Sequence, residues 1–230
     1  MEDPIAKIKQ AVEQGKPVII RLYALLGKTE EELNTVITGI LLKYNRTDLL
    51  GTVYTAVKEL AMNGAKANIK RILFQEKGID INDQKAYEQG MKSFRQILTE
   101  EFINTYAQKA CERNLYVDVR FDYNADRLIV EVTNNSPLTV EEDARIREKF
   151  KYSLKYESIA DFYMEMADNT EGAGMGITLI MMLLKAEGID PHMFTIRSDY
   201  KTKTVAKLEI PLSPDYKTSR ERFEEARGNQ

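Results

Sequence analysis

The chain has 230 residues, of which 43% are hydrophobic and 30% are charged, and this composition predicts one folded domain of generous size. Lysine and arginine total 33 against 36 acidic residues, for a formal net charge of -3. This near-balance argues against a nucleic-acid backbone as the main partner, because such partners usually select a basic surface.

The single cysteine, Cys111, rules out an internal disulfide and a cysteine-rich zinc site, which is typical of a reducing cytoplasm. The first ten residues, MEDPIAKIKQ, are too charged for a secretory signal. The longest apolar stretch, residues 177–184 with one threonine inside, is far shorter than the ~20 residues that span a bilayer. We therefore expect a soluble cytoplasmic protein without a membrane span.

Hydrophobic spacing predicts helices in the first half of the chain, interrupted by one β-branched segment. The expected elements there are helices at 3–14, 28–45, 47–78 and 83–113 and a strand at 17–24. At 115–134 the period changes to two around a turn at 124–126, which predicts a hairpin. A charged, weakly helical stretch (139–170), a helix (175–187) and two more alternating segments (192–200 and 203–212) follow.

This order of elements predicts an α+β two-layer sandwich, with a mixed, mostly antiparallel sheet and helices on one face. We expect a single domain over residues 1–230, with its core at about 17–212. The segment at about 79–113 would be a helical insertion, and the polar tail at about 213–230 a loose helix. The insertion could serve a protein partner or a homodimer contact, or it could simply add packing.

A polar stripe runs along the predicted 47–78 helix. Glu59, Asn63, Lys66 and Lys70 follow one another at steps of four, three and four residues, so they share a face. The simplest interpretation is a solvated face of an amphipathic helix. The alternative is a Mg²⁺-nucleotide site, because a carboxylate and an amide oxygen one turn apart suit a hard cation and a lysine suits phosphate.

A glycine loop directly precedes the apolar helix at 175–187. Closely spaced glycines expose consecutive backbone N–H groups, and the helix start adds unpaired donors, so together they suit a phosphate. The alternative is a flexible start of a buried helix. The spacing matches neither the P-loop pattern nor the Rossmann fingerprint. The glycines are Gly172, Gly174 and Gly176.

Taken together and in this order, these motifs resemble the GHKL superfamily of ATPases, whose fold is that of histidine-kinase-like ATPases. "ELAMNGAKAN" (59–68) resembles the family's N-box, and "EGAGMGITLIMMLL" (171–184) resembles the G2 box that ends its ATP lid. "LIVEVTNNSPLTVEE" (128–142) lies where the G1 box belongs, and "KTVAKLEIPL" (203–212) matches the closing strand. The resemblance covers residues from about 47 to 212.

The resemblance implies ATP and Mg²⁺ as cofactors and gives roles to particular residues. Asn63 would coordinate Mg²⁺, Lys66 would contact phosphate, and Glu59 would position or activate the attacking group. Asn134 would take the place of the family's aspartate, which accepts a hydrogen bond from the adenine amino group. Backbone N–H groups of the glycine loop would wrap the triphosphate: Gly172, Gly174 and Gly176.

The G1 region departs from the family pattern. Asn134 lacks the charge of an aspartate, and Ser136 and Leu138 replace two glycines. His192, the only histidine, lies after the N-box and next to Pro191, so we expect a surface or packing residue and no phosphoacceptor. Two functions stay open: an ATPase or protein kinase in signalling that acts in trans on a protein partner, and a degenerate domain that serves as an interaction module with or without nucleotide.

Overall fold

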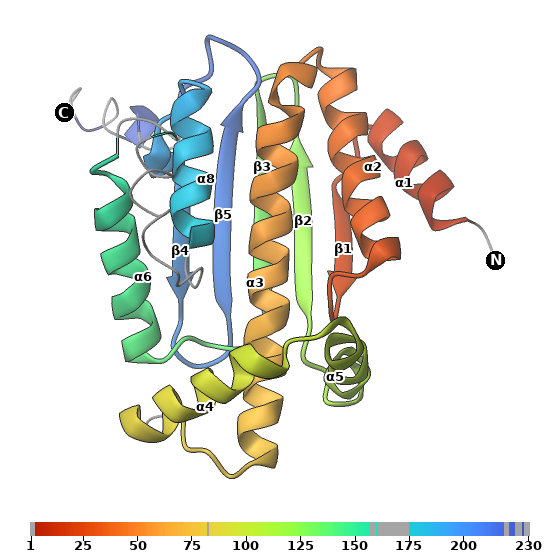
Figure 1. The fold of residues 1–230 in the computed structure, drawn as a ribbon. Helices are drawn as coiled ribbons and strands as arrows, with labels where there is room; N and C mark the ends of the chain where they lie inside the picture. Colours follow the sequence, from red (N-terminus) through yellow and green to blue (C-terminus); the bar gives the residue numbers. More distant parts are fainter. Residues whose placement is uncertain are drawn as a thin grey trace.

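A computed structural model describes residues 3–81, 83–156, 160, 175–218, 221–223 and 227. These residues include a five-stranded sheet with the order β1-β2-β3-β5-β4 (Figure 1). The strands are β1 (Val18–Leu22), β2 (Val117–Tyr123), β3 (Arg127–Asn134), β4 (Phe194–Ser198) and β5 (Thr204–Pro211).

All four strand pairings are antiparallel, which corrects the expectation of a mixed sheet. The two hairpins, β2–β3 and β4–β5, are antiparallel because their connections are short. Long connections that contain helices precede β2 and β4. Such connections allow either direction, so they do not determine how β1 pairs with β2 or how β3 pairs with β5. Asn124 stabilises the first hairpin turn, because its side chain accepts hydrogen bonds from the amides of Asp126 and Arg127.

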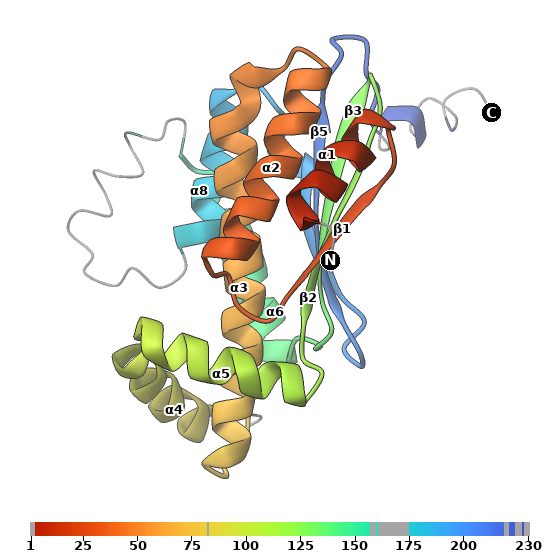
Figure 2. The same cartoon turned by 90° about the vertical axis from the view of Figure 1, so that its right-hand side faces the viewer.

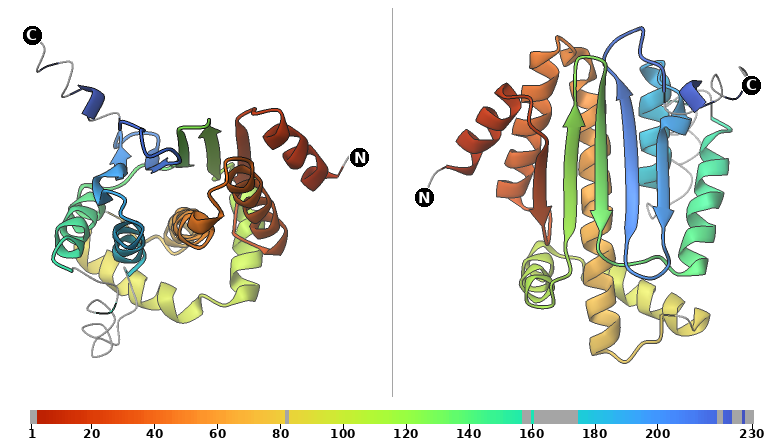
Figure 3. Two further views of the ribbon diagram at one scale, coloured as in Figure 1. Left: turned by 90° about the horizontal axis from the view of Figure 1, so that it is seen from above. Right: turned by 180° about the vertical axis from the view of Figure 1, so that it is seen from behind.

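Helices cover one face of the sheet, so the α+β two-layer arrangement is confirmed (Figure 2). The helices on this face are α2 (Gly27–Lys43), α3 (Leu50–Glu76), α6 (Val140–Ser153) and α8 (Met175–Ala186). Helix α1 (Pro4–Glu13) lies beside α2 near the edge strand β1 (Figure 3). Two short 3-10 helices, η1 (Thr47–Leu49) and η2 (Pro191–Met193), precede α3 and β4.

Helix α3 lies at the centre of the helical layer and forms the main core with the sheet. Its apolar face, which includes Val53, Val57 and Leu60, is buried, as the spacing predicts. In β2 and β3 every second side chain is buried, which matches their alternating pattern. A Cβ atom on Gly64 would lie 2.9 Å from a methyl carbon of Val117, so this glycine lets α3 approach β2 closely.

The segment expected to form one helix at 83–113 forms two, α4 (Gln84–Ile97) and α5 (Glu100–Glu112). The chain turns at Leu98, whose ψ is 71°. Thr99 then caps α5, because its hydroxyl accepts a hydrogen bond from the amide of Phe102. Both helices lie at the end of the sheet, against the second half of α3 (Figure 1). They pack on it through a second apolar cluster: Ile69, Ile72, Leu73, Phe94, Tyr106 and Ala110.

The described part of the C-terminal segment returns to the sheet. The hydroxyl of Tyr216 donates a hydrogen bond of 2.6 Å to Glu209 on β5. Residues 221–223 are helical, and most of the remaining tail lies outside the described residues. Within the described ranges, no helix combines the length and the apolar character needed to cross a membrane.

Candidate functional site

Glu59 and Asn63, the first two residues of the predicted polar stripe, lie on the side of α3 that faces α8. Glu59 and Lys66 are half-buried, and Asn63 between them is exposed. None of the three forms a hydrogen bond or an ion pair with another described residue. Their neighbour Lys58 instead pairs with Glu30 on α2.

Gly176, near the start of α8, lies directly against this stripe. A Cβ atom built on Gly176 would lie 2.8 Å from Oε2 of Glu59 and 3.1 Å from Nδ2 of Asn63. Any other residue would push these side chains aside, so the glycine is needed for the close approach. The last glycine of the loop and the first two residues of the stripe thus meet in space. Gly172 and Gly174 lie outside the described residues.

The groups at this contact could hold an anion and a cation side by side. The first N–H groups of α8 have no intrahelical partner and form the positive end of the helix dipole. The ammonium group of Lys66 adds a positive charge on α3. Asn63 and Glu59 offer the oxygen atoms that Mg²⁺ prefers, and Mg²⁺ usually takes its other ligands from phosphate and water. Among the described residues, no group of three or more His, Cys, Asp or Glu side chains could hold a metal ion.

Asn134, at the end of β3, is connected to the same part of α3. Its Nδ2 donates a hydrogen bond of 3.1 Å to the carbonyl of Gly64, the residue after Asn63. Its Oδ1 accepts from the hydroxyl of Ser136 at 3.1 Å, and that hydroxyl also lies 2.9 Å from Oδ1 of Asn68. All three polar side chains are buried. The amide of Asn134 is therefore already engaged with protein groups, although its oxygen can accept a second hydrogen bond.

Ser136 and Asn68 were not identified from the sequence as members of this network. A hydroxyl carries one proton, so Ser136 can donate to only one of the two asparagine oxygens. If the amide of Asn68 is turned by 180°, its Nδ2 donates to Ser136, and Ser136 donates to Asn134. This arrangement satisfies the amide nitrogen of Asn68, which otherwise has no partner among the described residues. The only feature of the sequence that could have indicated this network is the presence of polar residues at the end of a buried strand.

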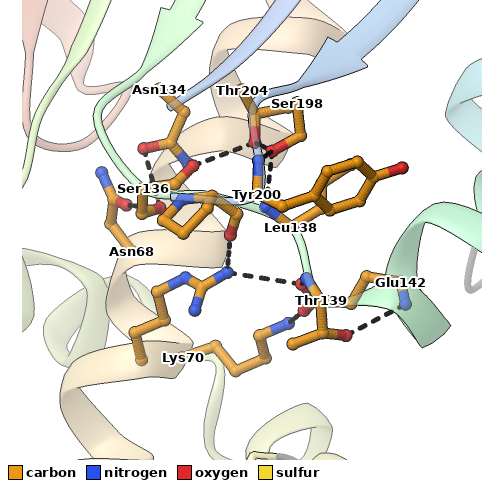
Figure 4. Close-up of polar contacts among 12 residues, drawn as sticks. Asn68, Lys70, Asn134, Ser136, Leu138, Thr139, Glu142, Ser198, Tyr200 and Thr204 are labelled. Atoms are coloured by element: carbon orange, nitrogen blue, oxygen red, sulfur yellow. Dashed lines mark hydrogen bonds and ion pairs between the residues drawn. The ribbon is translucent and has the colours of Figure 1, made fainter. Parts of the chain in front are cut away.

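The segment from Asn134 to Glu142, which connects β3 to α6, is held by the β4–β5 hairpin. The amide of Leu138 donates a hydrogen bond of 3.0 Å to the hydroxyl of Ser198. The hydroxyl of Thr204 donates one of 2.9 Å to the carbonyl of Ser136. Where the GHKL pattern has two glycines, this chain therefore has a segment fixed by side-chain contacts (Figure 4).

Lys70, expected on the exposed polar stripe, is buried instead. Its ammonium group pairs with Glu142, the third residue of α6. Glu142 also forms a capping box with Thr139, which the spacing T-x-x-E at 139–142 could have revealed. Arg71 contacts the other carboxylate oxygen at 3.3 Å. Burial alone would raise the pKa of Glu142, but the charges of Lys70 and Arg71 outweigh burial and hold it below its ordinary value.

His192 is exposed, which is the first of the two expected placements, and its Nδ1 lies 2.8 Å from the carboxylate of Asp190. Both residues lie in the short segment between α8 and β4, whereas Glu59 and Asn63 lie on α3. His192 takes no part in the contacts described above.

No known family model matches this chain. An uncharacterized protein of Treponema pallidum (strain Nichols) is 31% identical to it over 212 residues. The matched region is 92% of this chain but 41% of that relative, so the chain spans less than half of the relative's length.

Proposed function

We propose that this chain is a GHKL-type domain that binds Mg-ATP between α3 and α8. The observation that carries the proposal is the contact of Gly176 with Glu59 and Asn63. It joins the two motifs of the resemblance, which are more than a hundred residues apart in the sequence. The unpaired state of Glu59, Asn63 and Lys66 among the described residues supports it further.

In this proposal each side chain has one task. Asn63 holds Mg²⁺ through its amide oxygen, and Lys66 and the start of α8 neutralise phosphate oxygens. Bound Mg-ATP would supply a phosphoryl group for transfer. Glu59 orients the attacking hydroxyl or water and accepts its proton. The acceptor would be water, for an ATPase, or a residue of a protein partner, for a kinase that acts in trans.

The enzymatic part is tested by phosphate release and protein labelling with radioactive ATP and Mg²⁺. We expect turnover that Asn63→Ala abolishes. Asn104→Ala is a matched control, since Asn104 is also an exposed helical asparagine but lies on α5. If the wild type and Asn63→Ala release the same background phosphate and no partner is labelled, the chain is not an enzyme of this class.

A second function, a degenerate domain that acts as a protein-interaction module, is favoured by a different observation. Asn134 is bonded to Gly64, and the segment after it is fixed by Ser198 and Thr204. A base would have to bind beside this closed network. Calorimetry with ATP, ADP and GTP separates the cases: Mg-ATP affinity without turnover supports the module regulated by nucleotide, and no affinity for any nucleotide supports the module without one.

A further inference from the structure

Tyr87 of α4 contacts both α3 and α6. The side chain is buried, and its ring meets Phe74 of α3 edge-on, with 5.8 Å between ring centroids. Lys70 of α3 donates a hydrogen bond of 3.2 Å to the hydroxyl of Tyr87. The guanidinium carbon of Arg145 of α6 lies 4.9 Å from the centre of the same ring. One aromatic side chain thus links the α4–α5 pair to two helices of the main layer.

Lys70 continues this connection towards the candidate site. Its ammonium group pairs with Glu142, and both side chains are nearly buried, with 9% and 11% of their surface exposed. Glu142 accepts a hydrogen bond of 3.0 Å from the amide of Thr139, and Arg71 also contacts the carbonyl of Pro137. The ion pair therefore holds the segment that begins at Asn134 (Figure 4).

We infer that Tyr87 and Lys70 are positioning residues, through which the α4–α5 pair fixes the segment from Asn134 to Glu142. The reason is the local environment of the ion pair. Tyr87 keeps water away from Lys70 and directs its ammonium group, and a pair shielded from water is stronger than an exposed one. Without Tyr87, Lys70 and Glu142 would be solvated, and the segment would lose the ion pair as one of its connections to α3, beside those of Gly64, Asn68 and Arg71.

The consequence for nucleotide binding rests on the proposed function. Asn134 lies at the start of this segment, where the base would be recognised. A change at α4 that releases Lys70 therefore alters the base end of the site, while the contact between Gly176 and Asn63 is left in place. The α4–α5 pair, which could be regarded as simple extra packing, thereby controls the shape of one end of the site.

The inference is tested by hydrogen exchange and mass spectrometry on the full chain without nucleotide. We expect Lys70→Met to speed amide exchange at 138–146 about tenfold, the equivalent of one lost hydrogen bond to a charged group. Tyr87→Leu should have a similar effect, and Tyr87→Phe a smaller one in the same residues. Exchange in α1 and α2 should stay at the wild-type rate in all three variants.

Tyr106→Phe is the matched control. Tyr106 is also a buried tyrosine, its hydroxyl bonds Glu76, and Lys109 lies 4.3 Å from its ring centre, but it has no contact with α6 among the described residues. This variant should leave exchange at 138–146 unchanged. Tyr87→Phe is conservative enough to fold, so it decides the question if the larger changes unfold the chain. The inference is wrong if Tyr87→Phe and Tyr106→Phe give the same exchange at 138–146.

A second measurement separates this inference from the proposed function. If the wild type binds Mg-ATP, Tyr87→Phe and Lys70→Met should weaken that binding more than Tyr106→Phe does. Unchanged affinity together with faster exchange would overturn the link to nucleotide. If the wild type binds no Mg-ATP, the proposed function fails, and the exchange result still decides whether Tyr87 and Lys70 fix the segment.

Discussion

Gly176 lies so close to Asn63 that a Cβ atom on the glycine would be 3.1 Å from the asparagine's Nδ2. The glycine belongs to the start of α8, and the asparagine projects from the middle of α3. Their contact places the start of one helix, whose first N–H groups have no partner within that helix, beside an amide and a carboxylate of another helix. The proposed Mg-ATP site rests on this contact.

Gly176→Ala should impair ligand binding while leaving the fold intact. The added methyl group would displace the carboxylate of Glu59 and the amide of Asn63, both of which are ends of flexible side chains. We expect Mg-ATP affinity to fall at least about tenfold, since small misplacements of binding groups are costly. Gly51→Ala in α3 is the control, because nothing lies within 4 Å of its Cβ position. Calorimetry gives the affinities, and equal affinities in the two variants would contradict the role of Gly176.

Gly64→Ala should destabilise the protein. Its Cβ would lie 2.9 Å from Val117 in the core, where neither α3 nor β2 can move freely. We expect a loss of about 1–3 kcal/mol in the free energy of unfolding, as for other overpacked cores. Gly51→Ala should instead leave stability unchanged or raise it by less than about 1 kcal/mol, because Gly51 is exposed and lies in the first turn of α3. Urea denaturation measures both changes, and a neutral Gly64→Ala would show that α3 and β2 are less tightly packed.

The ion pair of Glu142 predicts a dependence of stability on pH. Because the folded-state pKa of Glu142 is lowered, its contribution is complete above the ordinary glutamate pKa of about 4.3 and is lost as the pH falls through the folded value. Glu142→Gln should therefore cost about 1.5–3 kcal/mol at pH 7 and less under acid conditions. The free energy of unfolding of both proteins, measured from pH 7 to pH 3, checks this. If the free energy of unfolding of the wild type and of Glu142→Gln changed with pH in the same way, the lowered pKa of Glu142 would be contradicted.

Asn134→Asp should also give a pH-dependent loss of stability, but for a different reason. An ionised aspartate cannot donate to the carbonyl of Gly64, so a buried acceptor would face another acceptor. We expect a loss of about 1–3 kcal/mol at pH 7. The loss should shrink at lower pH, where the protonated carboxyl can donate again. Urea denaturation at several pH values tests this. If the loss of stability did not depend on pH, the hydrogen bond from Nδ2 of Asn134 to Gly64 would not contribute to stability.

Local patterns were enough to predict the hairpins, α3 and the stripe of Glu59, Asn63 and Lys66. Each of these depends on residues that are close in the sequence, where the periods of 2 and 3.6 apply. The break between α4 and α5 at Leu98 was missed because the apolar spacing continues across it. The sheet was expected to be mixed, because no local pattern fixes the direction in which β1 pairs with a strand about a hundred residues away.

The contacts around Lys70 and Asn134 depend on distant residues and had no local signal. Lys70 has the same spacing as Lys66, yet it is buried because Glu142 and Tyr87 meet it from two other helices. Asn134 was expected to bind a base. Its hydrogen bond to the carbonyl of Gly64 could not be predicted from any sequence pattern. The approach of Gly176 to Glu59 and Asn63 followed only from the resemblance, because no periodicity relates α8 to α3.

The most direct test of the proposed site is the affinity for ATP, measured by calorimetry with excess Mg²⁺ and again with a chelator. The account predicts that the wild type and Asn104→Ala bind Mg-ATP equally, with a dissociation constant below about 1 mM. Asn63→Ala should bind at least about tenfold more weakly, as should the wild type without Mg²⁺. Equal affinity in Asn63→Ala and Asn104→Ala, or no binding by the wild type, would contradict it.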